Sequence, residues 1–244
     1  MSALVVMSSV PPLILIVPVY NEVECVGAFI DRWVNSLDGS GISFELHCYD
    51  DGSTDGTSEL LARAATLDAR VRHHRHSNRG HGPTIARGYQ EHASAPWVFQ
   101  VDADDVIGPA ALIGWWPDRE KCDLFMMSRR EPRRTAFRRG LSMCARRAVG
   151  VLFGGGIVDV NAPYRLLRND AFRAAFEAFP ADVLLPNVML SGFATTRQLR
   201  IRQDPIDVQG RMRGDTVRGM VRWVSLALRG FRQLATVTTR FRSA

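Results

Sequence analysis

The chain has 244 residues, of which 46% are hydrophobic and 23% charged, and its net charge is +6. This composition is ordinary for a globular protein of one large or two small domains, and it excludes a fibrous or disordered chain. The four cysteines form no C-x-x-C pair, which argues against a disulfide framework and a zinc site and predicts reduced thiols in a cytoplasmic protein.

The N-terminal segment is apolar as far as Glu22, the first charged residue, but Pro11, Pro12 and Pro18 interrupt it. No positively charged stretch precedes it, so we expect neither a signal peptide nor a spanning helix. No other segment reaches the roughly 18 apolar residues that a spanning helix needs. The sequence therefore predicts a soluble or peripheral protein.

Strands and helices alternate through the first half of the chain. Apolar runs predict strands at Leu13–Val17, Phe44–Tyr49, Arg70–His74 and Trp97–Val101, with helices at about Val23–Leu37, after Gly56, and at about Pro83–His92. This alternation is typical of a parallel α/β sheet, in which ligands bind at the carboxyl ends of the strands. The polar clusters Tyr20–Glu22, Asp50–Asp51 and Asp102–Asp105 should therefore meet at one edge of the sheet.

The second half of the chain is less regular. We predict strands at Asp123–Met127, Pro163–Leu167 and Ala194–Ile201, a helix at Thr135–Leu152 that ends before three glycines, and further helices between the strands. From Val217 onward apolar residues recur every three or four positions, with Arg on the other faces. The sequence predicts one domain over residues 1–210 and a basic amphipathic helical tail over residues 211–244.

Two segments carry most of the positive charge. Residues 129–147 and residues 211–244 each hold eight Arg and one acid, a net of +7, so the rest of the chain carries −8. Two basic patches on an acidic body favour local anionic contacts over general affinity for nucleic acid. The tail is expected either to lie on an anionic membrane or to pack as an ordinary C-terminal helix, and the sequence does not decide between them.

The sequence Asp102-Ala103-Asp104-Asp105 directly follows a predicted strand. The carboxylates of Asp102 and Asp104 can share one Mg²⁺ or Mn²⁺ ion, which would neutralise charge on a departing diphosphate. A solvated turn is the alternative interpretation of an Asp-x-Asp sequence.

The loop from Asp50 to Thr57 places two adjacent acids at a strand end, where Asp51 is our candidate for binding a base or ribose. Asp55 and Thr57 are expected to cap the next helix. The glycine-rich Asn78–Gly82 precedes a helix, and a helix N-terminus suits an anion. His73, His74 and His76 fit no standard zinc spacing and are expected at an exposed strand end.

Four motifs, taken together, resemble the family 2 glycosyltransferases in order and spacing: Pro18-Val19-Tyr20-Asn21-Glu22, Asp50 to Thr57, Asn78-x-Gly80-x-Gly82 and Asp102-Ala103-Asp104. The resemblance implies the GT-A fold, a Rossmann-like, mostly parallel sheet flanked by helices. It also implies a nucleotide-sugar site lined by Pro18, Val19, Tyr20, Glu22, Asp50, Asp51 and Asp102, with the metal at Asp102 and Asp104. The family often has Gln where this chain has Val106, so Asp105 or water would have to serve as the further metal ligand.

Later motifs resemble the polyprenyl-phosphate branch of that family, which includes dolichol-phosphate mannosyltransferases. They are Ser128-Arg129, Arg138-Arg139-Gly140-Leu141-Ser142, Asp159 to Arg165, and Arg211-x-x-Gly214-x-Thr216. The resemblance implies an inverting transfer in which Arg129, Arg138 and Ser142 hold the lipid phosphate. We expect a cytoplasmic enzyme that is peripheral at the inner face of the membrane. We expect no nucleic-acid partner, because no aromatic stacking motif accompanies the Arg-rich patches. A hydroxyl acceptor is the alternative, and Asp159 is our candidate for the base that such an acceptor requires.

Overall fold

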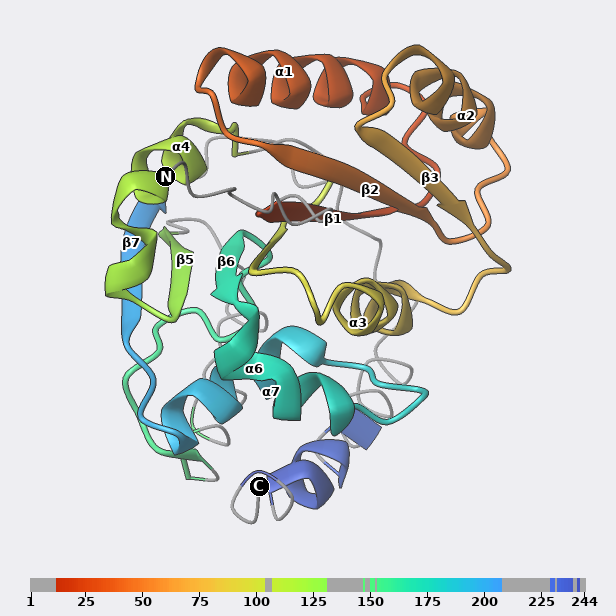
Figure 1. Cartoon of the computed structure of the whole chain (residues 1–244). Helices are drawn as coiled ribbons and strands as arrows, with labels where there is room; N and C mark the ends of the chain where they lie inside the picture. The colour runs from red at the N-terminus through yellow and green to blue at the C-terminus, as the bar shows by residue number, and fades with distance from the viewer. Residues whose placement is uncertain are drawn as a thin grey trace, which may run out of the picture.

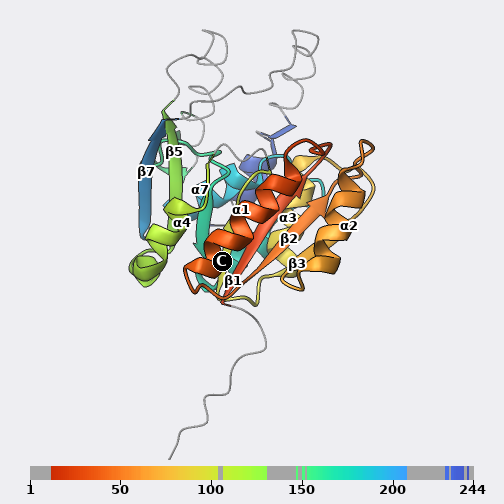
Figure 2. The same cartoon turned by 90° about the horizontal axis from the view of Figure 1, so that it is seen from above.

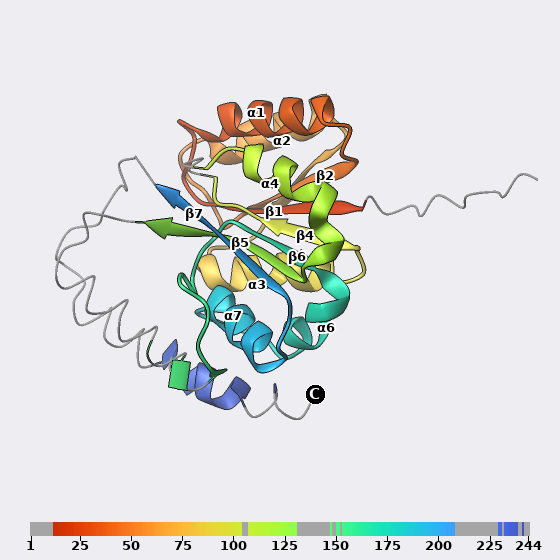
Figure 3. The same cartoon turned by 90° about the vertical axis from the view of Figure 1, so that its left-hand side faces the viewer.

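The computed structural model describes residues 12–103, 107–130, 147, 150, 151, 153–207, 229, 230, 232–238 and 241. Within these residues a seven-stranded sheet lies between two layers of helices (Figures 1 and 3). The predicted fold class, a mostly parallel α/β sheet flanked by helices, is confirmed.

The strands lie in the order β3-β2-β1-β4-β6-β5-β7. Their bounds are β1 Leu13–Val19, β2 Phe44–Asp50, β3 Val71–Arg75, β4 Trp97–Gln100, β5 Leu124–Arg130, β6 Arg165–Arg168 and β7 Ile201–Asp207. The short strand β6 is antiparallel to β4 and β5, and the other neighbouring pairs are parallel. Every residue of the interior strand β1, which lies between β2 and β4, is buried, and this explains its continuous apolar sequence.

Helices cover both faces of the sheet. On one face lie α1 (Val26–Gly39), α2 (Thr57–Leu67) and α4 (Ala110–Trp115), and on the other lie α3 (His81–Glu91), α6 (Asn169–Glu177) and α7 (Pro186–Thr196) (Figure 3). The buried apolar residues accordingly form two clusters, one on each side of the sheet. Figure 2 shows β5 and β7 on the side of the molecule away from α2 and β3.

The segment between β4 and β5 contains two short helices that the sequence did not predict, α4 and the 3-10 helix η1 (Trp116–Lys121). Tyr164 holds this segment, because its hydroxyl accepts a hydrogen bond from the backbone N–H of Leu112 (3.1 Å) and donates one to the carbonyl of Gly108 (2.9 Å). The Tyr164 ring also packs edge-on against Phe99 of β4, with 4.6 Å between ring centroids. One aromatic side chain thus fixes the chain between Gly108 and Leu112.

The strand predicted at Ala194–Ile201 is wrong. Helix α7 continues to Thr196, and β7 begins only at Ile201. Threonine favours strands, but the hydroxyls of Thr195 and Thr196 donate to the carbonyls of Ser191 and Gly192 one turn earlier in the helix. Because α7 is buried on nearly every side, its sequence has no helical period that could have revealed it.

Much of the predicted helix at 135–152 and of the predicted tail at 211–244 lies outside the described residues. In the described part of the tail, Leu234, Val237 and Phe241 are buried in the same apolar cluster as α6 and α7. The Phe241 ring lies 4.9 Å from that of Phe193 in α7. This part of the tail packs as an ordinary C-terminal helix. Among the helices in the described ranges, none combines the length and the apolar character needed to cross a bilayer.

Asp123, just before β5, joins three strands, because its carboxylate contacts Arg168 Nη2 (2.6 Å) and Arg200 Nη2 (2.9 Å). The hydrogen bonds from Arg200, outweighing burial, hold the pKa of Asp123 below its usual value. Because the pKa of Asp123 is lower in the folded than in the unfolded protein, its carboxylate stabilises the fold at any pH above the unfolded-state pKa of about 3.9. This stabilisation is lost as the pH falls through the folded-state pKa.

We expect Asp123→Asn to lower the free energy of unfolding at pH 7 by about 1–3 kcal/mol, measured by urea denaturation. The difference from the parent protein should shrink below about pH 4, where the parent carboxylate also becomes protonated. Asp170→Asn, which removes an exposed carboxylate 3.5 Å from Arg173, is the control and should change stability by less than about 0.5 kcal/mol. Equal stabilities of Asp123→Asn and the parent protein at pH 7 would contradict the prediction.

Candidate functional site

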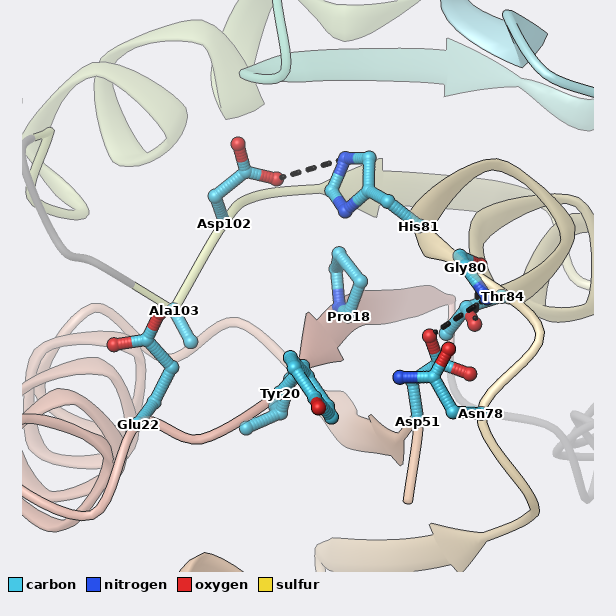
Figure 4. A pocket seen from close by; sticks show the side chains of 11 residues that line it. Pro18, Tyr20, Glu22, Asp51, Asn78, Gly80, His81, Thr84, Asp102 and Ala103 are labelled. Atoms are coloured by element: carbon cyan, nitrogen blue, oxygen red, sulfur yellow. Dashed lines mark hydrogen bonds and ion pairs between the residues drawn. The ribbon is translucent and has the colours of Figure 1, made fainter. Parts of the chain in front are cut away.

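A cavity of about 360 Å³ opens where the carboxyl ends of β1, β2 and β4 meet the beginning of α3. The chain leaves β1 toward β2 and β3 on one side and returns to β4 on the other, so the cavity lies where the strand order reverses. Its lining residues are Pro18, Val19, Tyr20, Glu22, Asp51, Asn78, Gly80, His81, Thr84, Asp102 and Ala103 (Figure 4). The predicted meeting of the three polar clusters at one edge is confirmed for Tyr20, Glu22, Asp51 and Asp102, whereas Asp104 and Asp105 lie outside the described residues.

Hydrogen bonds join the turn after β1 to the loop after β2. The side chain of Asn21 accepts from the backbone N–H of Thr54 (2.8 Å), while the N–H of Asn21 donates to the hydroxyl of Ser53 (3.0 Å). The N–H of Glu22 donates to the hydroxyl of Thr57 (2.9 Å). This framework leaves the neighbouring Tyr20 side chain 48% exposed at the cavity, where its ring is available for stacking.

Asp51 holds the loop that leads into α3. One of its carboxylate oxygens accepts from the N–H of Arg79 (2.7 Å) and the other from the N–H of Gly80 (2.9 Å). Gly52 permits this approach, because its φ is +77° and a Cβ there would lie 2.9 Å from the backbone nitrogen of Asn78. The Oδ2 of Asp51 keeps a second lone pair for a ligand in the cavity, while its Oδ1 also lies 3.5 Å from His76 Nδ1.

Asp50 was expected to line the nucleotide-sugar site, but the structure places it inside the protein. It is fully buried, and it is not among the residues that line the cavity. Its Oδ1 accepts from the N–H of Ser53 (2.8 Å), and its Oδ2 lies 3.6 Å from His73 Nε2. Burial raises the pKa of Asp50, but hydrogen bonds from Ser53, Ser58 and His73 together outweigh that effect, and the pKa is lower than usual. Asp50 therefore shapes the turn that presents Asp51.

The beginning of α3 forms one wall of the cavity and was missed as a source of site side chains. His81 and Thr84 lie in its first turn, and both line the cavity. A Cβ at Gly82 would overlap the carbonyl oxygens of Val183 and Leu184, so glycine lets this end of α3 pack closely on the segment before α7. The signal was present in the sequence, since Asn78-x-Gly80-x-Gly82 precedes a helix, and a helix N-terminus favours anions.

One carboxylate oxygen of Asp102 has no hydrogen-bond partner among the described residues. Its Oδ1 is buried and makes no hydrogen bond with any described group, and it lies 3.9 Å from His81 Nε2, too far for a hydrogen bond (Figure 4). The described lining contains three carboxylates, from Glu22, Asp51 and Asp102, and neither Lys nor Arg. Such a site can bind a cation, or the donor groups of a ligand, at Asp102.

Several predicted site residues lie outside the described part of the chain or only partly within it. Asp104, Arg138 and Ser142 are among the undescribed residues. The backbone of Arg129 belongs to β5 and pairs with Ile206 of β7. The roles expected for these residues remain predictions.

Asp159 does not line the cavity, but its segment enters the sheet nearby. Arg165, the first residue of β6, pairs with Gln100, which lies two positions before Asp102. The Arg165 side chain is fully buried, and it donates to the carbonyls of Ala162 (2.8 Å) and Asn187 (3.0 Å). A buried guanidinium therefore holds the loop between Asp159 and β6.

A family model described as glycosyl transferase family 2 matches residues 14–176. Similar curated proteins include two named undecaprenyl-phosphate 4-deoxy-4-formamido-L-arabinose transferase. The protein from Edwardsiella ictaluri is 23% identical over 215 residues, which are 87% of this chain and 64% of that protein. The protein from Shewanella sediminis is 27% identical over 183 residues, 74% of this chain and 55% of that protein. The matched part of the chain thus spans less than two thirds of the length of either relative.

Solved structures of similar fold include mannosyl-3-phosphoglycerate synthase from Rubrobacter xylanophilus, with a TM-score of 0.65, 15% identity and coverage of 93% of this chain and 75% of that one. Glucosyl-3-phosphoglycerate synthase from Mycobacterium tuberculosis has a TM-score of 0.66 and 16% identity, with coverage of 94% and 80%. The resemblance found in the sequence is confirmed. Because the family model covers more than half of the chain, including the cavity residues from Pro18 to Ala103, the chain belongs to the family 2 glycosyltransferases.

Proposed function

We propose that this glycosyltransferase moves a sugar, with inversion, from a nucleotide-sugar donor to a polyprenyl phosphate, with a divalent cation at Asp102 and Asp104. The observation that supports this most is the single cavity to which Tyr20, Asp51 and Asp102 contribute from three strand ends. Its volume of about 360 Å³ is within the usual range for a small-molecule site, roughly 300–1,000 Å³.

The donor is proposed to lie with its base near Tyr20 and Asp51. An exposed aromatic ring can stack on a base, and the remaining lone pair of Asp51 Oδ2 can accept from a base or ribose group. The first turn of α3 faces the cavity, where its dipole favours the diphosphate. A solved structure of the Mycobacterium tuberculosis synthase holds UDP and Mn²⁺, which supports the same ligand chemistry here.

The residues present fit a hard divalent cation. The buried Oδ1 of Asp102 has no hydrogen-bond partner among the described groups, and a carboxylate oxygen is a ligand that Mg²⁺ and Mn²⁺ accept. The acidic lining would repel a diphosphate unless a cation lay between them. When bound, the cation would neutralise charge on the leaving diphosphate.

The acceptor phosphate is proposed to be held by Arg129, Arg138 and Ser142. A phosphate monoester is largely ionised at neutral pH, so it needs positioning more than deprotonation. The planar guanidinium of Arg binds two phosphate oxygens at once. The undecaprenyl-phosphate names of the curated relatives support this acceptor class.

The transfer requires in-line geometry. A phosphate oxygen forms a bond to the anomeric carbon on the face opposite the diphosphate, and the bond from that carbon to the diphosphate oxygen breaks. We propose that the enzyme works as a peripheral protein at the inner face of the membrane, where the lipid acceptor lies. Contact through basic side chains would weaken as salt is added.

Transfer to a hydroxyl group is the second candidate. The solved structure of the Mycobacterium tuberculosis synthase that holds UDP and Mn²⁺ also holds glucosyl-3-phosphoglycerate, a product with a soluble acceptor. A hydroxyl acceptor needs a base, and the segment of Asp159 enters the sheet at the same edge as Asp102.

A transfer assay distinguishes the two candidates. The protein would be incubated with Mg²⁺ or Mn²⁺, a panel of nucleotide sugars, and either polyprenyl phosphate, free polyprenol or soluble hydroxyl acceptors, including phosphoglyceric acid. We expect product only with polyprenyl phosphate, and Asp159→Asn should lower that turnover less than about tenfold, because no base is required. Product only with hydroxyl acceptors, together with a loss of about 100-fold or more in Asp159→Asn, would overturn the lipid-phosphate proposal.

A further inference from the structure

Three histidines meet on the face of the sheet that α3 covers, apart from the cavity. His47 lies in β2, His74 lies in β3, and His92 directly follows the last residue of α3. Helix α3 begins at the cavity with His81 and has 11 residues, so His92 lies about 16 Å farther along the helix. The cluster therefore has no direct part in the proposed transfer reaction.

The ring nitrogens of the three histidines are close enough to share one ion. One nitrogen from each ring lies within 4.8 Å of the other two. The closest pair is His47 Nδ1 and His74 Nε2, 2.9 Å apart, and the His47 and His92 ring centroids are 4.0 Å apart. Three nitrogens bound to one zinc ion at about 2.0–2.1 Å would be about 3.4 Å from each other, so small side-chain shifts suffice.

The surrounding groups orient the rings as a metal site requires. Glu45 Oε2 lies 3.0 Å from His47 Nε2, and a carboxylate can only accept, so the proton of His47 is on Nε2 and the lone pair is on Nδ1, facing His74. A carboxylate behind a histidine is a common support for metal ligands. The ring of Tyr49 stacks on that of His74, with 4.7 Å between centroids.

His92 contributes a nitrogen that no described group satisfies. Its Nε2 is buried, and it has no hydrogen-bond partner among the described groups. Burial lowers the pKa of His47, His74 and His92 and so favours the neutral form of each ring. Neutral imidazole is the form that binds a metal ion.

We propose that His47, His74 and His92 form a second cation site, separate from Asp102, for a transition-metal ion of the Zn²⁺, Co²⁺ or Ni²⁺ type. Imidazole suits these ions, whereas Mg²⁺ and Mn²⁺ prefer carboxylate and phosphate oxygens. The three side chains leave the fourth position of a tetrahedral ion to water. An ion there joins β2, β3 and the end of α3, and so stabilises the side of the sheet that carries Asp51.

Metal binding to the full chain tests the site. Protein treated with EDTA and dialysed would be titrated with Co²⁺ and then Zn²⁺, in excess Mg²⁺ so that the carboxylate site is occupied. We expect one equivalent of Co²⁺ to bind with the visible absorption of a four-coordinate ion, Zn²⁺ to displace it, and the Tm to rise. If Co²⁺ and Zn²⁺ do not bind, or if excess Mg²⁺ abolishes their binding, the proposal is overturned. The contact between His47 and His74 is then an ordinary hydrogen bond between two imidazoles.

Substitutions assign the ligands. His92→Gln and His74→Gln should each weaken Zn²⁺ binding by about 100-fold or more, and Glu45→Gln by about 10- to 100-fold, since the carboxylate acts through His47. His73→Gln is the matched control, because His73 is the neighbour of His74 on β3 and contacts Asp50 instead. It should bind Zn²⁺ within about twofold of the parent protein, as should Asp102→Asn.

Circular dichroism would confirm that each variant is folded, and the less buried His92 and His74 are preferred over the buried His47 for this reason. Because both His92→Gln and His74→Gln are measured, the site can still be tested if one of these variants fails to fold. Unchanged Zn²⁺ affinity in the folded ligand variants, or a loss confined to Asp102→Asn, would refute the three-histidine site.

Discussion

Replacing Asp102 with asparagine is expected to lower kcat/KM for sugar transfer by about 100- to 1,000-fold, the usual cost of removing one well-placed electrostatic group from an active site. Asparagine keeps the shape of the side chain but removes its charge and one oxygen. The Oδ1 of Asp102 makes no hydrogen bond with a described group, so the substitution breaks no described hydrogen bond at that atom. The fold should therefore survive while the proposed cation site weakens.

The measurement is initial-rate transfer of a radiolabelled sugar over a range of Mn²⁺ and Mg²⁺ concentrations. The variant should need a higher metal concentration for half-maximal rate, and its Tm should stay close to that of the parent protein. Asp118→Asn, which removes the exposed partner of Lys121, is the control and should retain full activity. A variant Asp102→Asn with less than about fivefold loss and an unchanged metal requirement would refute the role of Asp102.

Replacing Arg165 with methionine is expected to lower the free energy of unfolding by about 3–5 kcal/mol. The Arg165 side chain is fully buried, and its guanidinium donates to backbone carbonyls of Ala162 and Asn187. Methionine can fill much of the space, but it leaves these acceptors without donors. The loop that carries Asp159 would then lose its connection to the beginning of α7.

Urea denaturation at pH 7 measures this loss, and Arg173→Met is the matched control. The side chain of Arg173 is 57% exposed and pairs weakly with Asp170, so its replacement should cost less than about 0.5 kcal/mol. Arg165→Lys should recover only part of the stability, because an ammonium group cannot reach several carbonyls with a planar fork. A loss below about 1 kcal/mol in Arg165→Met would show that the buried hydrogen bonds contribute little.

The sequence predicted the location of the site well for a simple physical reason. In a parallel sheet the carboxyl ends of neighbouring strands lie at one edge, so polar residues that follow apolar strands must come together. Tyr20, Asp51 and Asp102 follow this rule and line one cavity. Pro18 can also occupy its place in β1. Strand β4 pairs with β1 only as far as Ile16, so the backbone N–H that proline lacks is not needed for a hydrogen bond to β4.

The local sequence pattern did not predict the structure correctly where burial in the tertiary structure outweighed the intrinsic preference of a residue. Asp50 and Asp51 are adjacent and chemically identical in sequence, but the pleat sends one carboxylate into the protein and leaves the other at the cavity. The end of α7 contains two threonines that favour a strand, yet they continue a helix whose residues from Pro186 to Ala194 are all buried.

The sequence by itself determined the α/β class, the buried first strand, the family and the three strand ends that form the cavity, because each depends on residues close together in the chain. Only the tertiary structure decided the rest. His47 and His74 are 27 positions apart, and the carbonyl of Asn187 that receives a hydrogen bond from Arg165 is 22 positions away. Contacts at such separations leave no periodic signal in a single sequence, since they arise only when strands and helices pack together.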